Sequence, residues 1–286
     1  MKTIGLTALC LLVCILTQTG CCRKKAVFSN ELEGTLTIIG SSSTQEVCDA
    51  LANAFSKQHK KIEVVKSGAG SAQAAIAVSA GTAQIGDLSR ELNFDEHPEE
   101  FDSRPVAIDG IAVCVNLKNK ISALNSTQLK GIFTGKIKNW AEIGGANSPI
   151  VVLGRDEASG TKISFERLIG AENSCAYLIM QDSNGKIKEK IKNDENAIGY
   201  ISFSSVDDSV KATTIDGVAP TKNNILNSSY KLHHPFIQIV KKGCCDEIVN
   251  AWFDFIGSKT GQKIVESAGL TPISGFQKFH GSEGCV

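Results

Sequence analysis

The stretch 154–169, GRDEASGTKISFERLI, joins a predicted buried strand to a predicted helix through a turn rich in hydrogen-bond donors. Residues 151–153, VVL, form a short apolar run of the kind found at the end of a buried strand. After the turn, apolar residues stand at positions 163, 165, 168 and 169 among charged ones, which is helix-like spacing, and Ser159 is a suitable N-cap. The stretch therefore predicts a strand, a turn and a helix that begins near residues 159–161.

The order of side chains in this turn favours an anion site. A helix N-terminus offers unpaired N–H groups and the positive end of the helix dipole. Gly160 allows a ligand to approach the backbone closely, Ser159 and Thr161 add hydroxyls, and Arg155 offers a planar fork of donors. On these residues alone, a capped surface turn with an ion pair explains the order equally well.

Two more turns of the same kind lie earlier in the chain. GSSST at 40–44 and SGAGS at 67–71 each follow a predicted strand (36–39 and 62–66) and precede a predicted helix (44–58 and 71–80). In open α/β sheets, ligands bind outside the carboxyl ends of strands, where helices begin. Three such turns indicate one shared anion pocket, although none has the spacing of a Walker or Rossmann phosphate loop.

Strand and helix patterns alternate along the chain, which predicts an α/β fold with parallel strands. Further strands are expected near 84–86 and at 105–116, and an amphipathic helix at 246–268. We expect Trp140 and Trp252 to be packing residues, and the basic run 186–195 to be the solvated face of a helix.

The N-terminus predicts export. Lys2 precedes the apolar stretch 4–16, which is too short to span a bilayer and is typical of a signal peptide. Gly20 before Cys21 matches a bacterial lipoprotein cleavage site, although Gln18 stands where Leu is usual. We expect a signal peptide at 1–20 and a lipidated tether at 21–32, with the protein anchored through Cys21 on the periplasmic or outer cell face; the alternative is secretion without an anchor.

The composition argues against several classes of function. Lys+Arg and Asp+Glu both number 30, so the formal net charge is zero, which disfavours nucleic acid or an anionic membrane surface as the main partner. The ten cysteines include no CxxC, and the five histidines show no ligand spacing, so we predict neither a metal site nor a cofactor. Disulfide pairing cannot be read from the sequence.

Eight segments, in order and spacing, carry a family resemblance over about residues 35–275: GSSST, GAGS, QIGDLSREL, AIDGIAVCVN, IFTGKIKNWAEIGG, GRDEASGTKISF, AIGYISF and GLTPIS. With them the chain resembles the phosphate-binding proteins of bacterial phosphate ABC transporters, which have the type II periplasmic-binding-protein fold. IFTGKIKNW and RDEASGT are specific to this resemblance, whereas GAGS alone is not.

The resemblance implies that phosphate is bound between two lobes by hydroxyls, helix-terminal N–H groups and one arginine. Thr44 would donate its hydroxyl and Gln45 its backbone N–H. Glu157, or Asp156 beside it, would orient Arg155 and offset its charge when the site is empty. The full set of implied phosphate-binding residues is Ser43, Thr44, Gln45, Ser71, Ser89, Arg155, Ser159, Gly160 and Thr161.

Two positions depart from the family pattern. Gln45 stands where an aromatic or small residue is more usual, and Ser89 stands where some members have Asp. That Asp accepts a hydrogen bond from the protonated oxygen of the bound phosphate and so disfavours sulfate, which carries no proton at neutral pH. A buried acceptor without a donor costs about 1–3 kcal/mol or more. Whether another acceptor faces the ligand stays open here.

The resemblance also implies the domain organisation: lobe I at 33–109 and 236–275, lobe II at 114–232, two hinge strands between them, and a C-terminal tail at 276–286. It implies a monomer that captures inorganic phosphate and delivers it to an ABC permease. The alternatives are another tetrahedral oxyanion, such as sulfate or molybdate, or a surface lipoprotein with phosphatase activity.

Enzymatic readings find less support. SGTK at 159–162 and KTG at 259–261 match two elements of serine penicillin-recognising enzymes, but the SDN element is missing and KTG lies in a predicted helix. A phosphatase would need a metal or a nucleophile–base pair, and neither is recognisable. A pure adhesion role would leave the three donor-rich turns unexplained. We therefore predict that the chain catalyses no reaction.

Overall fold

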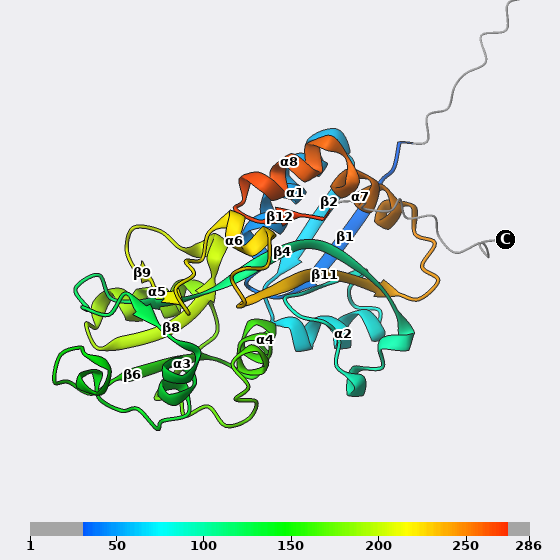
Figure 1. Ribbon diagram of the computed structural model, residues 1–286. Helices are drawn as coiled ribbons and strands as arrows, with labels where there is room; N and C mark the ends of the chain where they lie inside the picture. Colours follow the sequence, from blue (N-terminus) through cyan, green and yellow to red (C-terminus); the bar gives the residue numbers. More distant parts are fainter. Residues whose placement is uncertain (1–30, 274–286) are drawn as a thin grey trace, which may run out of the picture. The chain divides into compact units, whose positions relative to one another are not determined.

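A computed structural model of the chain describes residues 31–273, and from Leu32 onward these belong to one compact unit (Figure 1). The predicted signal peptide, Cys21, nearly all of the tether and the tail at 276–286 lie outside the described residues. Within residues 31–273, no helix has both the length and the apolar character needed to cross a membrane.

The elements alternate as predicted, and the predicted starts and ends lie close to those observed. The first part of the chain forms β1 (Gly34–Gly40), α1 (Gln45–Gln58), β2 (Ile62–Ser67), α2 (Ser71–Ser79), β3 (Ile85–Leu88) and β4 (Phe101–Val115). The middle part forms β5 (Ala123–Leu124), α3 (Ser126–Phe133), β6 (Val151–Arg155), α4 (Gly160–Leu168), β7 (Ile179–Gln181), α5 (Asn184–Asn193), β8 (Ala197–Ser202), β9 (Lys211–Ala212), β10 (Thr214–Ile215) and α6 (Lys222–Leu226). The last part forms β11 (His233–Lys241), α7 (Glu247–Gly257), α8 (Lys259–Ser267) and β12 (Thr271–Pro272).

The single helix predicted at 246–268 is wrong in one respect, because Ser258 divides it into α7 and α8. The backbone of Ser258 is extended (φ −70°, ψ 161°), and its hydroxyl accepts a hydrogen bond from the N–H of Gly261 at 3.1 Å. Ser258 is thus an N-cap inside an otherwise continuous apolar pattern, and periodicity alone does not reveal such a break.

The main sheet is mixed, which corrects the expectation of parallel strands. Its order is β2-β1-β3-β11-β4-β8-β6-β7, with β9 and β12 also paired to β4. β1 is parallel to β2 and β3, and β6 is parallel to β7 and β8, as strand–helix alternation predicts. The long strands β4 and β11 run antiparallel to each other and to β8 and β3 respectively, and side-chain alternation does not encode strand direction.

Helices cover both faces of the sheet (Figure 1). The buried apolar side chains form several separate clusters. In one cluster, Phe55 of α1 packs edge-on against Trp252 and Phe255 of α7, at ring-centroid distances of 5.3 and 5.6 Å. α2 lies on the opposite face of the same strands. Trp140 and Trp252 are both fully buried, as expected for packing residues.

A buried polar chain connects this core to the strand ends. The indole N–H of Trp252 donates to Gln238 Oε1 at 2.8 Å, and Gln238 Nε2 donates to Asp87 Oδ1 at 2.8 Å. Burial raises the pKa of Asp87 to about 6, because desolvation of the carboxylate outweighs the hydrogen bonds that lower it. Asp87 therefore holds its proton over a wider pH range in the folded chain than in the unfolded one.

This shift makes Asp87 a source of pH-dependent stability. Because the folded pKa is above the unfolded value, the folded state binds more protons between about pH 4 and 6, and stability falls as pH rises through that window. We predict that Asp87→Asn, which keeps an acceptor for Gln238, removes this fall in stability. Between pH 4 and 7 the free energy of unfolding of wild type should drop by up to about 3 kcal/mol relative to that of the variant. Urea unfolding of both proteins at four pH values measures it, and parallel pH profiles would contradict the assignment.

Candidate functional site

Four helix N-termini point donors toward one region of the fold. The three predicted turns lead into α1, α2 and α4, and a fourth turn, between β7 and α5, joins them. Ser159 caps α4 as predicted, because its hydroxyl accepts from the N–H of Lys162 at 3.2 Å. Ser183 caps α5 in the same way, accepting from Lys186. The convergence of helix ends that the sequence predicts is thus present, with one more helix than expected.

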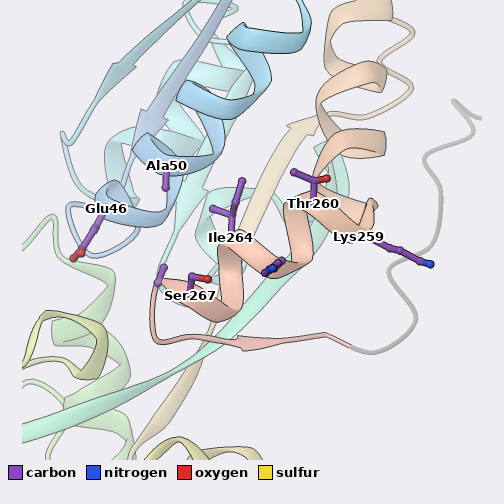
Figure 2. Close-up of a pocket in the computed structure, with 8 residues that line it drawn as sticks. Glu46, Ala50, Lys259, Thr260, Ile264 and Ser267 are labelled. Atoms are coloured by element: carbon purple, nitrogen blue, oxygen red, sulfur yellow. The ribbon is translucent and has the colours of Figure 1, made fainter.

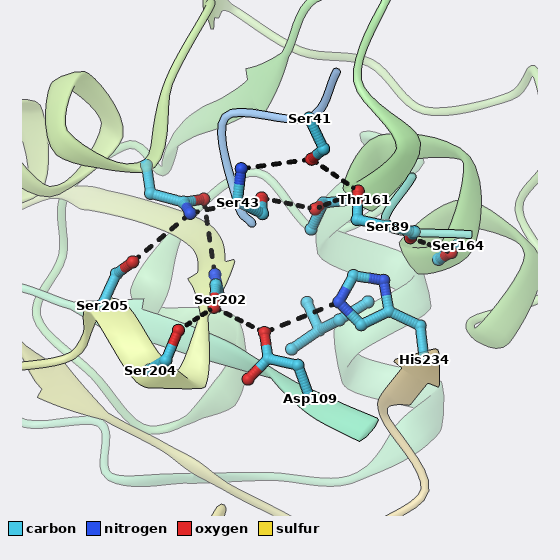
Figure 3. A network of polar contacts seen from close by, with 12 residues as sticks. Ser41, Ser43, Ser89, Asp109, Thr161, Ser164, Ser202, Ser204, Ser205 and His234 are labelled. Carbon is cyan, nitrogen blue, oxygen red and sulfur yellow. Dashed lines mark hydrogen bonds and ion pairs between the residues drawn. The ribbon is translucent and has the colours of Figure 1, made fainter. Parts of the chain in front are cut away.

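Five buried hydroxyls from these turns and from the end of β3 form a connected cluster, most of which is drawn in Figure 3. Thr161 Oγ1 lies 2.8 Å from Ser43 Oγ and donates to Ser89 Oγ at 3.2 Å. Ser41 Oγ donates to Ser89 Oγ at 2.9 Å, and Ser71 Oγ lies 3.4 Å from it. Four predicted residues, Ser43, Ser71, Ser89 and Thr161, are therefore brought together, and Ser41 joins them.

Gly160 lies where only a glycine fits against this cluster. A Cβ atom added at Gly160 would lie 2.3 Å from Ser71 Oγ and 2.7 Å from Ser89 Oγ. The first turn of α4 therefore presents bare backbone to the hydroxyls, as the predicted close approach requires.

Arg155 is a buried cation that only neutral groups hold. The residue is 2 % exposed, and its guanidinium donates to Asn184 Oδ1 at 2.9 Å, to Ser42 Oγ at 2.8 Å and to the carbonyl oxygen of Asp182 at 2.9 Å. Burial lowers the pKa of Arg155, although an arginine stays charged at neutral pH. No carboxylate in residues 31–273 forms an ion pair with this guanidinium, and the nearby charges of Asp156 and Asp182 act on it without direct contact. The positive charge is therefore not neutralised by a hydrogen-bonded carboxylate.

The structure does not support the expectation that Glu157 orients Arg155. The Glu157 carboxylate is exposed and pairs with Lys162 Nζ, which also lies 3.9 Å from Glu166 Oε1. Lys162 follows the capped start of α4, and its ammonium attracts Glu157 away from the guanidinium. Asn184 and Ser42 fix the fork of Arg155 in its place.

Of two further predicted residues in the first turn, Thr44 differs from the expectation and Gln45 is compatible with it. The Thr44 hydroxyl donates to the carbonyl oxygen of Ser41 at 2.8 Å, within its own turn, rather than joining the hydroxyl cluster. Gln45 is the first residue of α1 and its side chain is exposed, so only its backbone N–H can serve the site, as proposed. Within the same turn, Ser41 and Ser42 provide the hydroxyls that face the cluster and Arg155.

Sequence reasoning missed Asn184, although a rule applied elsewhere would have found it. The segment QDSN at 181–184 follows a strand and precedes a helix, as the three predicted turns do. Asn184 Nδ2 donates to Ser43 Oγ at 3.3 Å, and its Oδ1 accepts from the N–H of Ser202 at 3.4 Å as well as from Arg155. Its side chain therefore joins the hydroxyl cluster to the cation.

Beyond Asn184, the polar network continues to the long strands (Figure 3). Ser202 Oγ donates to Asp109 Oδ2 on β4, and the same oxygen lies 3.6 Å from His234 Nε2 on β11. Asp109 and His234 are opposite each other in the register of the two strands, and both are buried. The site is thus tied by a hydrogen bond to β4, which pairs with β11 in the middle of the sheet.

A surface pocket of about 650 Å³ lies between α1 and α8, and it contains none of these donors (Figure 2). Glu46, Lys259, Thr260 and Ile264 are among its lining residues, and none of the predicted site residues lines it. Its side chains come from the exposed faces of two helices and include no buried polar group. Volume alone therefore does not locate the site, whereas the convergence of buried donors does.

Comparison with known proteins places the chain in a family. A PBP superfamily domain matches residues 29–260. The phosphate-binding protein PstS of Bacillus subtilis is 34% identical over 260 residues, which cover 88% of this chain and 85% of that protein. The crystal structure of a putative phosphate ABC transporter substrate-binding protein with bound phosphate from Clostridium perfringens is 37% identical, with a TM-score of 0.82 over 84% of this chain and all of that one.

A second solved structure agrees: an ABC-type phosphate transport receptor from Vibrio cholerae is 32% identical, with a TM-score of 0.72 over 84% of this chain and 100% of that one. The predicted two-lobed type II periplasmic-binding-protein fold is confirmed by these likenesses, and the family is one of transporter substrate-binding proteins rather than enzymes. The chain belongs to the PBP superfamily and, within it, to the family of the PstS phosphate-binding proteins.

Proposed function

We propose that this protein binds inorganic phosphate at the hydroxyl cluster and Arg155 and delivers it to an ABC permease. The observation that carries the proposal is the buried guanidinium of Arg155, which has only neutral partners among the described residues. Burying a charge without an opposite charge is costly, and a bound anion offsets that cost. Relatives named as phosphate-binding proteins support phosphate as the anion.

The proposed binding residues divide into those that give hydroxyls, those that give backbone N–H groups and the cation. Ser43, Ser71, Ser89 and Thr161 provide hydroxyls, Gln45 and Gly160 provide backbone N–H groups at helix starts, and Arg155 provides charge. Ser159 shapes the start of α4 as its cap, and Thr44 shapes the first turn from within. To these we add Ser41 and Asn184, on the contacts described above.

We further propose that the two lobes, at 33–109 with 236–275 and at 114–232, close on the ligand about the strands β4 and β11. Support comes from the core, whose clusters fall into two sets of residues with a division near residues 107–111 and 232–236. The site takes Ser43, Ser71 and Ser89 from one set of segments and Arg155 and Thr161 from the other. The hydroxyls of Ser43 and Thr161 lie 2.8 Å apart, so phosphate has to replace their contact. Its entry therefore requires the lobes to open.

A different tetrahedral oxyanion is the second candidate, and Ser89 favours it. A hydroxyl donates or accepts equally well, so Ser89 does not penalise an unprotonated anion as a carboxylate would. Titration calorimetry with phosphate, sulfate, arsenate and molybdate tests both candidates. We expect phosphate to bind one-to-one; binding of sulfate or molybdate alone would contradict the proposal.

Phosphatase activity is not supported. Among residues 31–273, no group of three or more His, Cys, Asp or Glu side chains is placed to hold a metal ion. Glu157, the acid nearest in sequence to the Ser159–Thr161 turn on its N-terminal side, pairs with Lys162, and Ser159 is committed to capping α4. The chain's relatives bind and transport their substrate.

Members of this family are extracytoplasmic binding proteins. We propose for this chain a signal peptide at 1–20 and a lipid anchor at Cys21, from the apolar stretch and the Gly20–Cys21 pair. Cys245 is disulfide-bonded, which fits an oxidising compartment outside the cytoplasm. The tether of about a dozen residues leaves the binding unit free to act as a monomer near the membrane.

Arg155→Ala should weaken phosphate binding by about 2–5 kcal/mol, the usual cost of truncating one partner of a buried charged interaction. Titration calorimetry measures the loss. Arg167→Ala is the matched control, since Arg167 lies on α4 but is exposed and pairs with Glu172. Equal affinities of the two variants would show that Arg155 does not hold the anion.

Gly160→Ala should weaken phosphate binding at least tenfold, because the added methyl group would meet Ser71 and Ser89 as the lobes close. The loss corresponds to about 1.4 kcal/mol or more. Gly185→Ala on α5 is the control, since an added Cβ there meets no atom within 4 Å. Wild-type affinity in Gly160→Ala would mean that α4 does not approach the ligand as proposed.

Cys21→Ser should release the protein from membranes without changing phosphate affinity, since the first strand begins at Gly34. Two or more acyl chains hold a protein stably at a membrane, and the variant would carry none on this residue. Cell fractionation and mass spectrometry of the mature N-terminus measure the effect. An unmodified N-terminus that begins at another residue would overturn the lipid anchor but not the export.

A further inference from the structure

A groove of about 650 Å³ opens on the surface between α2 and the segment 90–101. Its walls are apolar where the two elements meet, with Ala72, Ala75 and Ile76 on one side and Phe101 on the other. Ile163 of α4 also lines the groove. The groove is separate from the hydroxyl cluster, since no predicted phosphate-binding residue lines it.

Large apolar side chains at this groove are exposed to solvent. Phe94, between the lining residues Asn93 and Asp95, is 94% exposed, and Ile76, which lines the groove, is 60% exposed. Neither belongs to an apolar core cluster. An aromatic ring that is fully exposed beside an apolar groove adds nothing to folding, but it is the type of residue that dominates binding at protein interfaces.

The segment that carries Phe94 is strongly acidic. Residues 91–102, ELNFDEHPEEFD, contain six Asp or Glu, at positions 91, 95, 96, 99, 100 and 102, and no Lys or Arg, while the whole chain has equal numbers of acids and bases. Asp95, Glu96 and Glu100 line the groove itself. Glu96 is neutralised by Arg90, through contacts of 2.6 Å from each terminal nitrogen. Lys242 Nζ donates to the carbonyl oxygen of Glu99 at 3.2 Å and Lys241 Nζ to that of Ser79 at 3.5 Å, so two ammonium groups lie at the rim beside Asp95 and Glu100.

The segment has a defined conformation despite its exposure. Asn93 and Glu96 form a capping box around the short helix Phe94–Glu96, with the N–H of Asn93 donating to Glu96 Oε2 at 2.7 Å. His97 then adopts a left-handed conformation (φ 54°, ψ 59°), which is unusual for a residue other than glycine and joins this helix to the next one at Pro98–Glu100. Such local strain is often found in functional segments.

The groove is also coupled to the binding site through its two helices. α2 begins at Ser71 and α4 at Gly160, so both helices that line the groove start at the hydroxyl cluster. The carbonyl oxygen of Ala158 accepts from the N–H of Ala72 at 3.3 Å, which joins these helix starts directly. Opening of the lobes would separate Ile163 from α2, so the groove has its full lining only in the closed form.

We propose that this acidic groove is the surface by which the closed, loaded protein docks on its permease, and that it receives an apolar side chain flanked by Lys or Arg. The proposal rests on the proposed phosphate delivery. Charge complementarity requires a basic partner, and the same acids would repel an anionic lipid surface or a second copy of this acidic segment. Because the groove is complete only when the lobes are closed, docking there would distinguish loaded from empty protein.

The test uses proteoliposomes that hold the ABC permease from the cell that makes this protein, with the mature binding protein added outside. The groove variant is Ile76→Ser with Phe94→Ser, and the charge variant is Asp95→Asn with Glu100→Gln. We expect both to bind phosphate within twofold of wild type by calorimetry, and to need at least a tenfold higher protein concentration for half-maximal phosphate uptake. Added salt should weaken wild type more than the charge variant.

Leu178→Ser is the matched control, because Leu178 is 68% exposed but does not line the groove. If the groove variant reached half-maximal uptake at the same protein concentration as wild type, the proposed docking surface would be wrong, although phosphate binding would be unaffected. An equal loss of uptake in Leu178→Ser, or wild-type dimers that the groove variant abolishes in sedimentation, would also overturn it. Wild type that binds no phosphate would overturn the proposed function, and the docking surface with it.

Discussion

The burial of the Arg155 guanidinium without a carboxylate partner is the constraint on which the site depends. A charge removed from water needs hydrogen-bond acceptors, and here they come from separate segments: Ser42 after β1, Asp182 and Asn184 around the start of α5. Asp182 contributes only its backbone carbonyl oxygen, so all of these acceptors are neutral. They satisfy the hydrogen-bond geometry of the guanidinium without neutralising its charge. The same contacts that hold the arginine therefore leave the site attractive to an anion.

The hydroxyl cluster has a complementary property. Serine and threonine hydroxyls can donate to one another or to a ligand, so the pocket needs no charged group to keep it intact when its helices lie together. Ser43 and Thr161 touch across the segments that we assign to different lobes, and Gly160 allows backbone and hydroxyls to meet. Closure is thereby stabilised by contacts that an oxyanion can replace one for one, which fits a protein that must both capture and release.

The same helices connect this chemistry to the surface. α2 and α4 begin at the cluster, and farther along their length they wall the acidic groove beside Phe94. A change in the distance between their first turns is therefore a change in the groove. A partner that contacts this groove would sense the ligand through rigid helices and would need no separate signal.

The sequence predicted the alternation of strands and helices, the helix starts and most of the hydroxyls, because N-caps, glycines and apolar periodicity are local features. The direction of β4 and β11, the break at Ser258 and the role of Glu157 depend on neighbours far along the chain. Lys162, in the first turn of α4, pairs with the Glu157 carboxylate, and no spacing rule predicts that pairing. The sequence could not predict which hydroxyls of the first turn, Ser41 to Thr44, face the site. Each of them can do so after a small change of the backbone. Asn184 was missed although its turn obeys the rule that located the others.

The most direct test of the account is a crystal structure of the mature protein grown with phosphate. The account predicts one phosphate ion bound by the Arg155 guanidinium and the N–H groups at the start of α4, with the Ser43–Thr161 hydrogen bond replaced by contacts to phosphate oxygens. A phosphate bound elsewhere, with Arg155 still held only by Ser42, Asn184 and backbone carbonyls and with Ser43 still bonded to Thr161, would contradict it.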